Sequence, residues 1–237
     1  MSEVKISQET PANHNKKMLW EGIVAATPII IGYVPISITF GMLGGQSGIS
    51  LYHTLLMSIL VFAGASQFVG INMMLAGAAS TTIILTTLVL NLRHMIMSMS
   101  LMNKINFLPV SMKAILSFGI TDETFAVASL KDRNSGWFLS GLIFASYITW
   151  VLGTLIGGLL ANFIPPSISS IMGISLYAMF IGLLIPAIRN SWKLILIVIP
   201  SALLSYFFSL FLNDGWSIVL ATILGSALGI FIKIEED

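Results

Sequence analysis

The sequence predicts an all-α protein, a polytopic bundle of transmembrane helices. Of its 237 residues, 56% are hydrophobic and only 9% are charged, whereas soluble domains carry about 25% charged residues. The apolar residues are gathered into long runs, and a run of about 20 residues is enough to cross a bilayer as a helix. Composition therefore excludes an ordinary water-soluble domain, and a net charge of +1 without a basic patch does not indicate nucleic-acid binding.

Eight apolar runs predict about eight spans in a single transmembrane domain, residues 19–232, with polar tails at 1–18 and 233–237. The runs are 19–43, 51–76, 81–102, 110–130, 137–163, 168–188, 194–212 and 216–232. The first run is longer than the apolar core of a signal peptide, about 7–15 residues. We therefore expect it to be retained as the first helix.

The distribution of lysine and arginine predicts the orientation of the bundle. With eight crossings and a cytoplasmic N-terminus, only Lys104 and Lys113 lie outside. The cytoplasmic ones are Lys5, Lys16, Lys17, Lys131, Arg133, Arg189, Lys193 and Lys233. This excess follows the positive-inside rule. A re-entrant second or fourth segment, which reduces the count to seven or six spans, would turn the later loops over.

The first and second spans contain residues that interrupt helices. Pro28 and Pro35 lack the N–H that would bond the carbonyl four residues back, and Gly32 lies between them. Gly64 begins a run of small residues in the second span. We expect helix breaks at these four positions, because broken helices line ion and substrate sites in transporters. An ordinary proline-kinked membrane helix is the alternative.

The third span carries the sequence Asn91-Leu92-Arg93-His94. An arginine at the centre of a membrane helix costs roughly 2.5–3.5 kcal/mol on insertion scales, so Arg93 requires a partner or a function. In a regular helix Asn91 and His94 share a face with Ser98, while Arg93 lies about 100° from His94. The three polar groups can therefore act together only if the third span breaks there.

The fourth span carries Thr121-Asp122-Glu123-Thr124. Carboxylates inside a membrane normally face a cavity, pair with a cation or carry protons. Asp122 or Glu123 is the natural counter-charge to Arg93. A purely structural ion pair is the alternative, since buried pairs also occur without a transport role.

Two further polar groups and a set of methionines have both functional and packing interpretations. Ser66 and Gln67 can offer polar groups to a ligand, or belong to a small-residue helix interface. The methionines at 95, 97, 99 and 102 favour adaptable apolar packing over copper binding, because Met97 lies off the shared face and the chain has no cysteine. We expect neither a metal nor another cofactor.

In order and spacing, several of these blocks resemble the AzlC family, the large subunits of bacterial branched-chain amino acid exporters. The blocks are Pro28 with Gly32 and Pro35, Phe40-Gly41, residues 62–68, residues 91–94, residues 121–126 and Trp150. The resemblance implies export of branched-chain amino acids, often with methionine, across the cytoplasmic membrane, driven by an ion gradient. It also implies a small membrane partner of the AzlD type.

A zwitterionic substrate needs a cation or N–H donors for its carboxylate, acceptors for its ammonium and an apolar pocket for its side chain. Arg93, or helix N-termini at a break in the first or third span, would meet the carboxylate. Asp122 or Glu123 would meet the ammonium or take the coupling proton. His94 would share the proton step, since imidazole changes protonation near neutral pH, or serve as a buried interhelical hydrogen-bonding group. Gln67, Ser66 and Asn91 would complete the polar shell.

The remaining motifs separate the possible functions. The chain has no G-x-x-x-x-G-K-[ST] phosphate loop, so it does not hydrolyse ATP by that route. Secondary transport, with a proton as the expected coupling ion given the resemblance, is favoured; a separate ATPase subunit and a passive channel for a small polar solute are the alternatives. An intramembrane enzyme is the least supported class. Asp122 and Glu123 are adjacent and cannot converge as a catalytic dyad, and no His-Glu-x-x-His or Gly-x-Ser-x-Gly motif is present.

Overall fold

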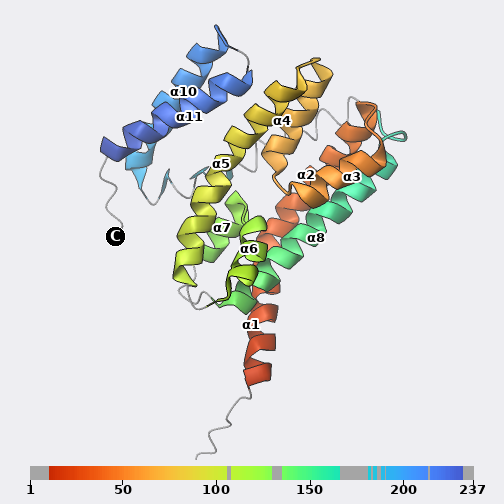
Figure 1. Cartoon of the computed structure of the whole chain (residues 1–237), viewed down its shortest axis with the longest axis vertical. Helices are drawn as coiled ribbons and strands as arrows, with labels where there is room; N and C mark the ends of the chain where they lie inside the picture. The colour runs from red at the N-terminus through yellow and green to blue at the C-terminus, as the bar shows by residue number, and fades with distance from the viewer. Residues whose placement is uncertain are drawn as a thin grey trace, which may run out of the picture.

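The computed structural model describes residues 11–105, 108–129, 135–165, 181–182, 184–185, 188–189, 191–212 and 214–231. Within these ranges every regular element is a helix, which confirms the all-α class. The elements are α1 (Pro11–Ala25), α2 (Thr27–Gln46), α3 (Leu51–Leu60), α4 (Gly64–Leu75), α5 (Ser80–Lys104), α6 (Val110–Phe118), α7 (Asp122–Ser129), α8 (Gly136–Leu160), the 3₁₀ helix η1 (Trp192–Leu194), α10 (Ile195–Ser209) and α11 (Asp214–Phe231) (Figure 1).

Each predicted span in the described part of the chain corresponds to one long helix or to two consecutive helices. The first, second and fourth spans are the pairs α1–α2, α3–α4 and α6–α7, whereas α5 and α8 are single helices. The sixth span, 168–188, lies largely outside the described residues, as does the C-terminal tail. Four of the described helices are long and apolar enough to cross a membrane: Thr27–Gln46, Ser80–Met102, Gly136–Leu160 and Trp192–Ser209.

Helix α2 passes through Gly32 and Pro35 without interruption, which differs from the break predicted there. Pro35 removes one backbone hydrogen bond, but the turns on either side stay helical against α8. Pro28 lies in the first turn of α2, where a missing N–H costs little. The hydroxyl of Thr27 donates to the carbonyl of Val24 at 2.7 Å, and so supplies the hydrogen bond that Pro28 cannot make.

The helices α1 and α2 pack along α8 in the same direction. A Cβ added at Gly22 would overlap the carbonyl oxygen of Phe138, and one added at Gly157 would overlap the carbonyl oxygen of Ile38. Residue numbers therefore rise in the same direction along α1–α2 and along α8. Because glycines at these points let the backbones touch, the α2–α8 pair forms a closely packed frame. We call the end where α8 begins the N-terminal end.

Helix α3 runs along α8 in the opposite direction. Leu51, at the start of α3, lies against Gly158 near the end of α8. The carbonyl of Ile59 accepts a hydrogen bond from the Tyr147 hydroxyl at 3.0 Å, so the end of α3 lies halfway along α8. The helix stops there, and Phe62 has a φ of +44°, a left-handed conformation that a phenylalanine rarely adopts.

Helix α4 then returns along α2 towards the end from which α3 started. The ring of Phe62 lies 6.4 Å from that of Tyr33, and the ring of Phe68, further along, lies 5.4 Å from that of Phe40. Since residue numbers rise together, α4 is parallel to α2 and antiparallel to α3 (Figure 1). We call residues 51–75 the α3–α4 hairpin. Gly64, one of the four predicted break positions, is the first residue of α4.

A second hairpin, α6–α7 (residues 110–129), enters from the N-terminal end. Leu108, just before α6, lies against Gly136, the first residue of α8. At the tip, Gly119 lies against Ile143, further along α8. Helix α7 ends a short segment before α8 begins, so the chain has returned to the N-terminal end (Figure 1).

The arms of both hairpins are too short to cross a membrane. They contain 10, 12, 9 and 8 residues, or about 12–18 Å at 1.5 Å per residue, against a hydrocarbon core of about 30 Å. Among the described residues up to 165, α2, α5 and α8 are long and apolar enough to cross. The second and fourth predicted spans fold back as hairpins, which agrees with the re-entrant alternative to eight full crossings that the sequence left open.

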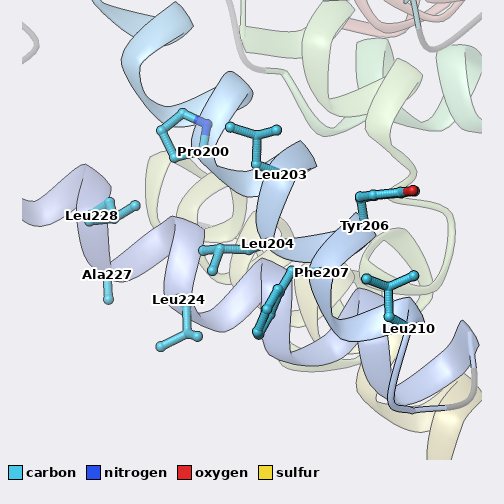
Figure 2. Close-up of a pocket in the computed structure, with 9 residues that line it drawn as sticks. All are labelled: Pro200, Leu203, Leu204, Tyr206, Phe207, Leu210, Leu224, Ala227 and Leu228. Carbon is cyan, nitrogen blue, oxygen red and sulfur yellow. The ribbon is translucent and has the colours of Figure 1, made fainter.

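The pair α10–α11 has an apolar surface. Helix α11 also contacts α5. A groove of about 780 Å³ runs over the pair (Figure 2). It is lined by Pro200, Leu203, Leu204, Tyr206, Phe207, Leu210, Leu224, Ala227 and Leu228. Such a groove offers no charged group to a polar solute.

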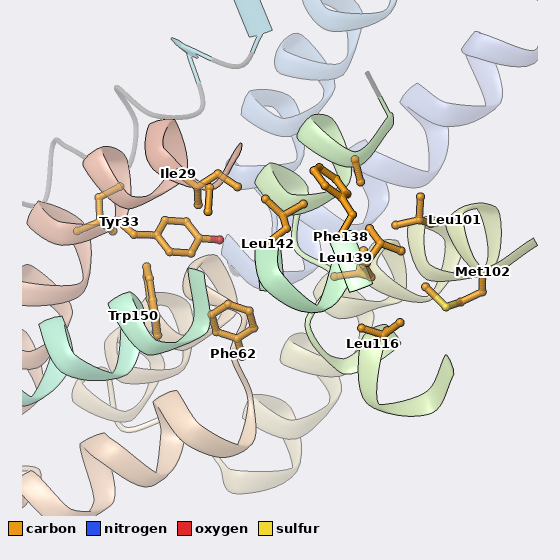
Figure 3. Packing of buried hydrophobic residues seen from close by; sticks show 14 of the residues in the cluster. Ile29, Tyr33, Phe62, Leu101, Met102, Leu116, Phe138, Leu139, Leu142 and Trp150 are labelled. Atoms are coloured by element: carbon orange, nitrogen blue, oxygen red, sulfur yellow. The ribbon is translucent and has the colours of Figure 1, made fainter. Parts of the chain in front are cut away.

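The tip of the α3–α4 hairpin lies in the main buried cluster, where Phe62 is close to Tyr33 and Trp150 (Figure 3). The ring of Tyr33 packs edge-on against Trp150, with the centroids 5.1 Å apart. Phe62 lies at the tip of the α3–α4 hairpin and Phe118 at the end of α6, and their ring centroids are 6.4 Å apart. Two segments that enter from opposite ends of the molecule are thus in contact midway.

The hairpins make a testable prediction about sidedness. The chain has no cysteine, so single-cysteine variants are specific probes. We expect Ser47→Cys, after α2, and Ala79→Cys, after α4, to react with a membrane-impermeant maleimide from the same side of the membrane. Ser111→Cys, at the start of α6, should react from the other side. The cysteine-free chain is the control, and labelling of positions 47 and 79 from opposite sides would contradict the hairpin.

Candidate functional site

Tyr33 joins the tip of the α6–α7 hairpin to α2. Its buried hydroxyl donates a hydrogen bond to Oε2 of Glu123 at 2.7 Å and lies 2.8 Å from Oγ1 of Thr121. Because a tyrosine hydroxyl has a single proton, Thr121 is the donor in the second bond. Glu123 is only 8% exposed, so this carboxyl is held inside the protein and away from lipid.

Two threonines close the hairpin tip. The N–H of Thr121 donates to Oγ1 of Thr124 at 2.8 Å, and the N–H of Thr124 donates to Oγ1 of Thr121 at 3.3 Å. The Thr124 hydroxyl also donates to the carbonyl of Gly119 at 3.1 Å. This reciprocal pairing of residues three apart satisfies backbone groups that a helix start leaves open. The sequence Thr-Asp-Glu-Thr therefore forms a turn that leads into α7 and bonds its own backbone groups.

Arg93 of α5 pairs with Asp122 at the start of α7. Nη1 of Arg93 lies 3.0 Å from Oδ2 of Asp122, which confirms the predicted ion pair and identifies its acidic member. Glu123, the next residue, points instead at α2, as expected for neighbours about 100° apart on a helix. The two side chains are 39% and 25% exposed, so neither is sealed inside the protein.

Gln67 and Ser66 anchor the α3–α4 hairpin. The indole N–H of Trp150 donates to Oε1 of Gln67 at 3.1 Å, and Nε2 of Gln67 donates to Oγ of Ser58 at 3.2 Å. Ser58 in turn bonds Thr154 of α8 at 2.8 Å. The Ser66 hydroxyl donates back to a carbonyl of its own segment. The polar groups of both residues are engaged within the protein, which is the packing interpretation of this stretch.

A cavity of about 550 Å³ lies between α5, α6 and the break in the α3–α4 hairpin. Its wall on α5 is Asn91, His94, Met95, Ser98, Met99 and Met102. The opposite wall is Ala114, Ser117 and Phe118 of α6, with Val61 and Ala63 at the hairpin break. The cavity therefore combines a few polar side chains with methionines and one aromatic ring, the composition of a small-molecule site.

Two polar atoms of the cavity walls have no hydrogen-bond partner within the described residues. They are Oδ1 of Asn91 and Nε2 of His94, and both are buried. Buried polar atoms are normally satisfied, and each exception costs about 1–3 kcal/mol. Because both atoms belong to residues that line one cavity, this cavity is the candidate site.

Helix α5 is continuous from Ser80 to Lys104, so the third span does not break at the polar stretch. Asn91, His94 and Ser98 line the cavity, as their shared face predicts, while Arg93 turns towards α7. Helix breaks are present in the second and fourth spans instead. The residues that sequence reasoning missed are Tyr33, Ser117 and Phe118; a lone tyrosine among the apolar residues of the first span was the available signal.

The unsatisfied atom of Asn91 generates a prediction about stability. Asn91→Leu removes a buried polar atom that has no partner, so the ligand-free protein should be as stable as the parent or more stable, by up to about 1–3 kcal/mol. Gln67→Leu is the matched control, because it breaks two formed hydrogen bonds and should lower stability. Thermal unfolding in detergent measures both. Equal destabilisation by the two substitutions would contradict the unsatisfied state of Asn91.

Comparison with known proteins places these features in a family. The profile of the family described as AzlC protein matches residues 28–164, the stretch that holds α2, both hairpins, α5 and α8. Inner membrane protein YgaZ of Escherichia coli is 34% identical over 73% of this chain and 75% of its own length. An uncharacterized membrane protein of Archaeoglobus fulgidus is 37% identical over 73% of this chain and 77% of its own.

A third relative is named for a transport function. The branched-chain amino acid transport protein AzlC of Bacillus subtilis is 26% identical over 64% of this chain and 62% of its own length. No solved structure matches the chain. The family profile covers more than half of the sequence and includes every element of the site described above. The chain therefore belongs to the AzlC family of membrane transport proteins.

Proposed function

We propose that the protein is a secondary active transporter that exports branched-chain amino acids, and other amino acids of similar shape such as methionine, across the bacterial cytoplasmic membrane. The observation that carries the proposal is the cavity beside α5, with two unsatisfied polar atoms in a wall rich in methionine. The family membership and the name of the Bacillus subtilis relative, a branched-chain amino acid transport protein, support the substrate class. The same family implies a small AzlD-like membrane subunit as partner.

The cavity suits an aliphatic amino acid. Its volume of about 550 Å³ is within the range of about 300–1,000 Å³ for small-molecule sites. We expect the alkyl side chain to lie against Met95, Met99 and Phe118, because apolar walls favour an apolar substituent. Asn91 and His94 would then bond polar groups of the substrate and satisfy their open atoms.

The Arg93–Asp122 ion pair, whose arginine is adjacent in sequence to the cavity residue His94, suits the charged ends of an amino acid. Arg93 can bind a carboxylate and Asp122 can bind an ammonium group, so a zwitterion that enters between them replaces one ion pair with two. A proton can occupy the Asp122 carboxylate in place of the ammonium. Binding of substrate and proton at one carboxylate is mutually exclusive, which is the condition for exchange of an outgoing amino acid for an incoming proton. Glu123 and His94 remain candidates for passing that proton on.

The hairpins support a proposal about the orientation in the membrane. They bring Lys104 and Lys113, which eight crossings would put outside, to the N-terminal end. Segments 47–50, 76–79 and 161–165 at the opposite end contain no lysine or arginine. We therefore propose that the N-terminal end faces the cytoplasm, in accord with the positive-inside rule. The single-cysteine variants described above also report which face of the cell each end occupies.

The substrate assignment is tested by uptake of labelled leucine or valine into inverted vesicles from cells that express this chain together with an AzlD-like subunit. We expect uptake that depends on a proton gradient and shows counter-flow with unlabelled substrate. Vesicles that contain the Asn91→Leu variant are the matched control, and we expect their uptake to be lower than that of the parent. The proposal fails if no branched-chain amino acid is taken up although both subunits are present. Flux that persists without a gradient and without counter-flow indicates the passive channel instead.

The charge pair has its own test. Arg93→Gln and Asp122→Asn should each reduce transport more than tenfold, the equivalent of about 1.4 kcal/mol, because each removes a group that binds one end of the zwitterion. The double variant should stay inactive. Glu21→Gln, a carboxyl change in α1 outside the site, is the control, and membrane content is measured for each variant. Recovery of transport in the double variant would mean that the pair is only structural.

A further inference from the structure

The two hairpins occupy opposite halves of the path through the molecule. The α3–α4 hairpin enters from the end opposite the N-terminal end, the α6–α7 hairpin enters from the N-terminal end, and Phe62 and Phe118 touch where they meet. The cavity is bounded by both, through Ala63 on one side and Ser117 on the other. Each hairpin therefore separates the cavity from one end of the molecule.

The α3–α4 hairpin is tightly bound to the α2–α8 frame. A Cβ at Gly44 would collide with Thr54, and one at Gly64 would collide with the ring of Trp150. Gln67 adds the buried hydrogen bonds to Trp150 and Ser58. Close backbone contact and a satisfied buried network make this hairpin a fixed part of the structure.

The α6–α7 hairpin contacts α5 and α8 along its arms and meets α2 mainly at its tip. Val110 and Ile115 on the outer face of α6 are 81% and 72% exposed, while Leu116 on the inner face is buried. Towards α2, the tip is held by the hydroxyl of Tyr33, which bonds Thr121 and Glu123. Because the contact with α2 consists of a small number of groups, these hydrogen bonds affect how often the tip separates from α2.

We propose that Tyr33 is a positioning residue that latches the α6–α7 hairpin closed against α2, and that release of this latch opens the cavity to the N-terminal end. The proposal rests on the proposed transport function. The ring of Tyr33 is fixed by Phe62 and Trp150, so its hydroxyl is presented by the immobile part of the molecule. The groups that it holds belong to the movable part.

The latch is placed where a substrate can act on it. Glu123 bonds Tyr33, and its neighbour Asp122 pairs with Arg93. Both carboxyls lie in the first turn of α7, so a ligand that separates Arg93 from Asp122 displaces the same turn that Tyr33 holds. Binding at the ion pair and opening of the hairpin are thereby linked through one short helix.

The test measures access to the cavity without using a substrate. Ser117→Cys places a thiol in the cavity wall on α6, in a chain that has no other cysteine. In this background, Tyr33→Phe removes the hydroxyl and keeps the ring. We expect the rate of labelling by an impermeant maleimide, added from the N-terminal side, to rise roughly tenfold, the effect of losing a hydrogen bond to a charged group. Labelling from the opposite side should not change.

Matched variants separate a latch from general loosening. Tyr147→Phe also removes a tyrosine hydroxyl, but one that bonds Ile59 of the other hairpin, so labelling of the Ser117→Cys thiol should stay at the parent rate. Glu123→Leu should act like Tyr33→Phe, whereas Glu123→Gln retains an acceptor and should stay close to the parent. Ile71→Cys, at a fully buried position of α4, should remain unlabelled in all of them.

The outcomes that overturn the latch are unchanged labelling in both Tyr33→Phe and Glu123→Leu, an equal increase in Tyr147→Phe, or labelling of the Ile71→Cys thiol. If Tyr33→Phe does not accumulate in the membrane, Glu123→Leu compared with Glu123→Gln decides the question. The substrate assignment fails separately, in the vesicle uptake experiment. Side-specific labelling that follows the Tyr33 hydroxyl would support the latch even if the transported solute were a different one.

Discussion

Irregular backbone at the middle of a membrane must be satisfied by protein, because no water is present there. Both hairpin tips are of this kind, and the rest of the described structure is arranged to enclose them. The closely packed α2–α8 pair provides the wall, since its glycines bring the two helix backbones into contact. Phe62, Tyr33 and Trp150 cover one tip, and the paired threonines of the 121–124 turn satisfy the other.

Within that enclosure the polar groups divide into two sets. Gln67 and Glu123 are bonded to residues of the α2–α8 pair and hold a hairpin in position. Asn91 and His94 retain unsatisfied atoms beside a cavity, which costs stability as long as no partner bonds them. The ion pair of Arg93 and Asp122 has features of both sets. Like the first set it holds a hairpin in position, because it joins α5 to the α6–α7 hairpin, and like the second set it remains partly exposed.

Much of this arrangement was predictable. The positions of most helices follow from the lengths of the apolar runs, and the pairing of Arg93 with an acidic residue of the fourth span follows from the cost of a lone charge in a membrane. The re-entrant course of residues 51–75 was not predictable. A long apolar run has the same hydropathy whether it crosses the bilayer or turns back halfway, and the turn depends on contacts with α2 and α8 that are distant in sequence.

The sequence by itself therefore determined the all-α membrane class, the ends of α5 and α8 to within a few residues, and the helical face that Asn91 shares with His94, because these depend on composition and on the helical period alone. Only the tertiary structure decided that this face lines a cavity, that Gln67 is hydrogen-bonded to Trp150, and that Tyr33 connects two hairpins. Those outcomes depend on which helix lies opposite. In a membrane almost every helix surface is apolar, so the pattern of apolar side chains does not determine which helices pack together. Close contacts between glycines and the backbone of the facing helix determine it instead.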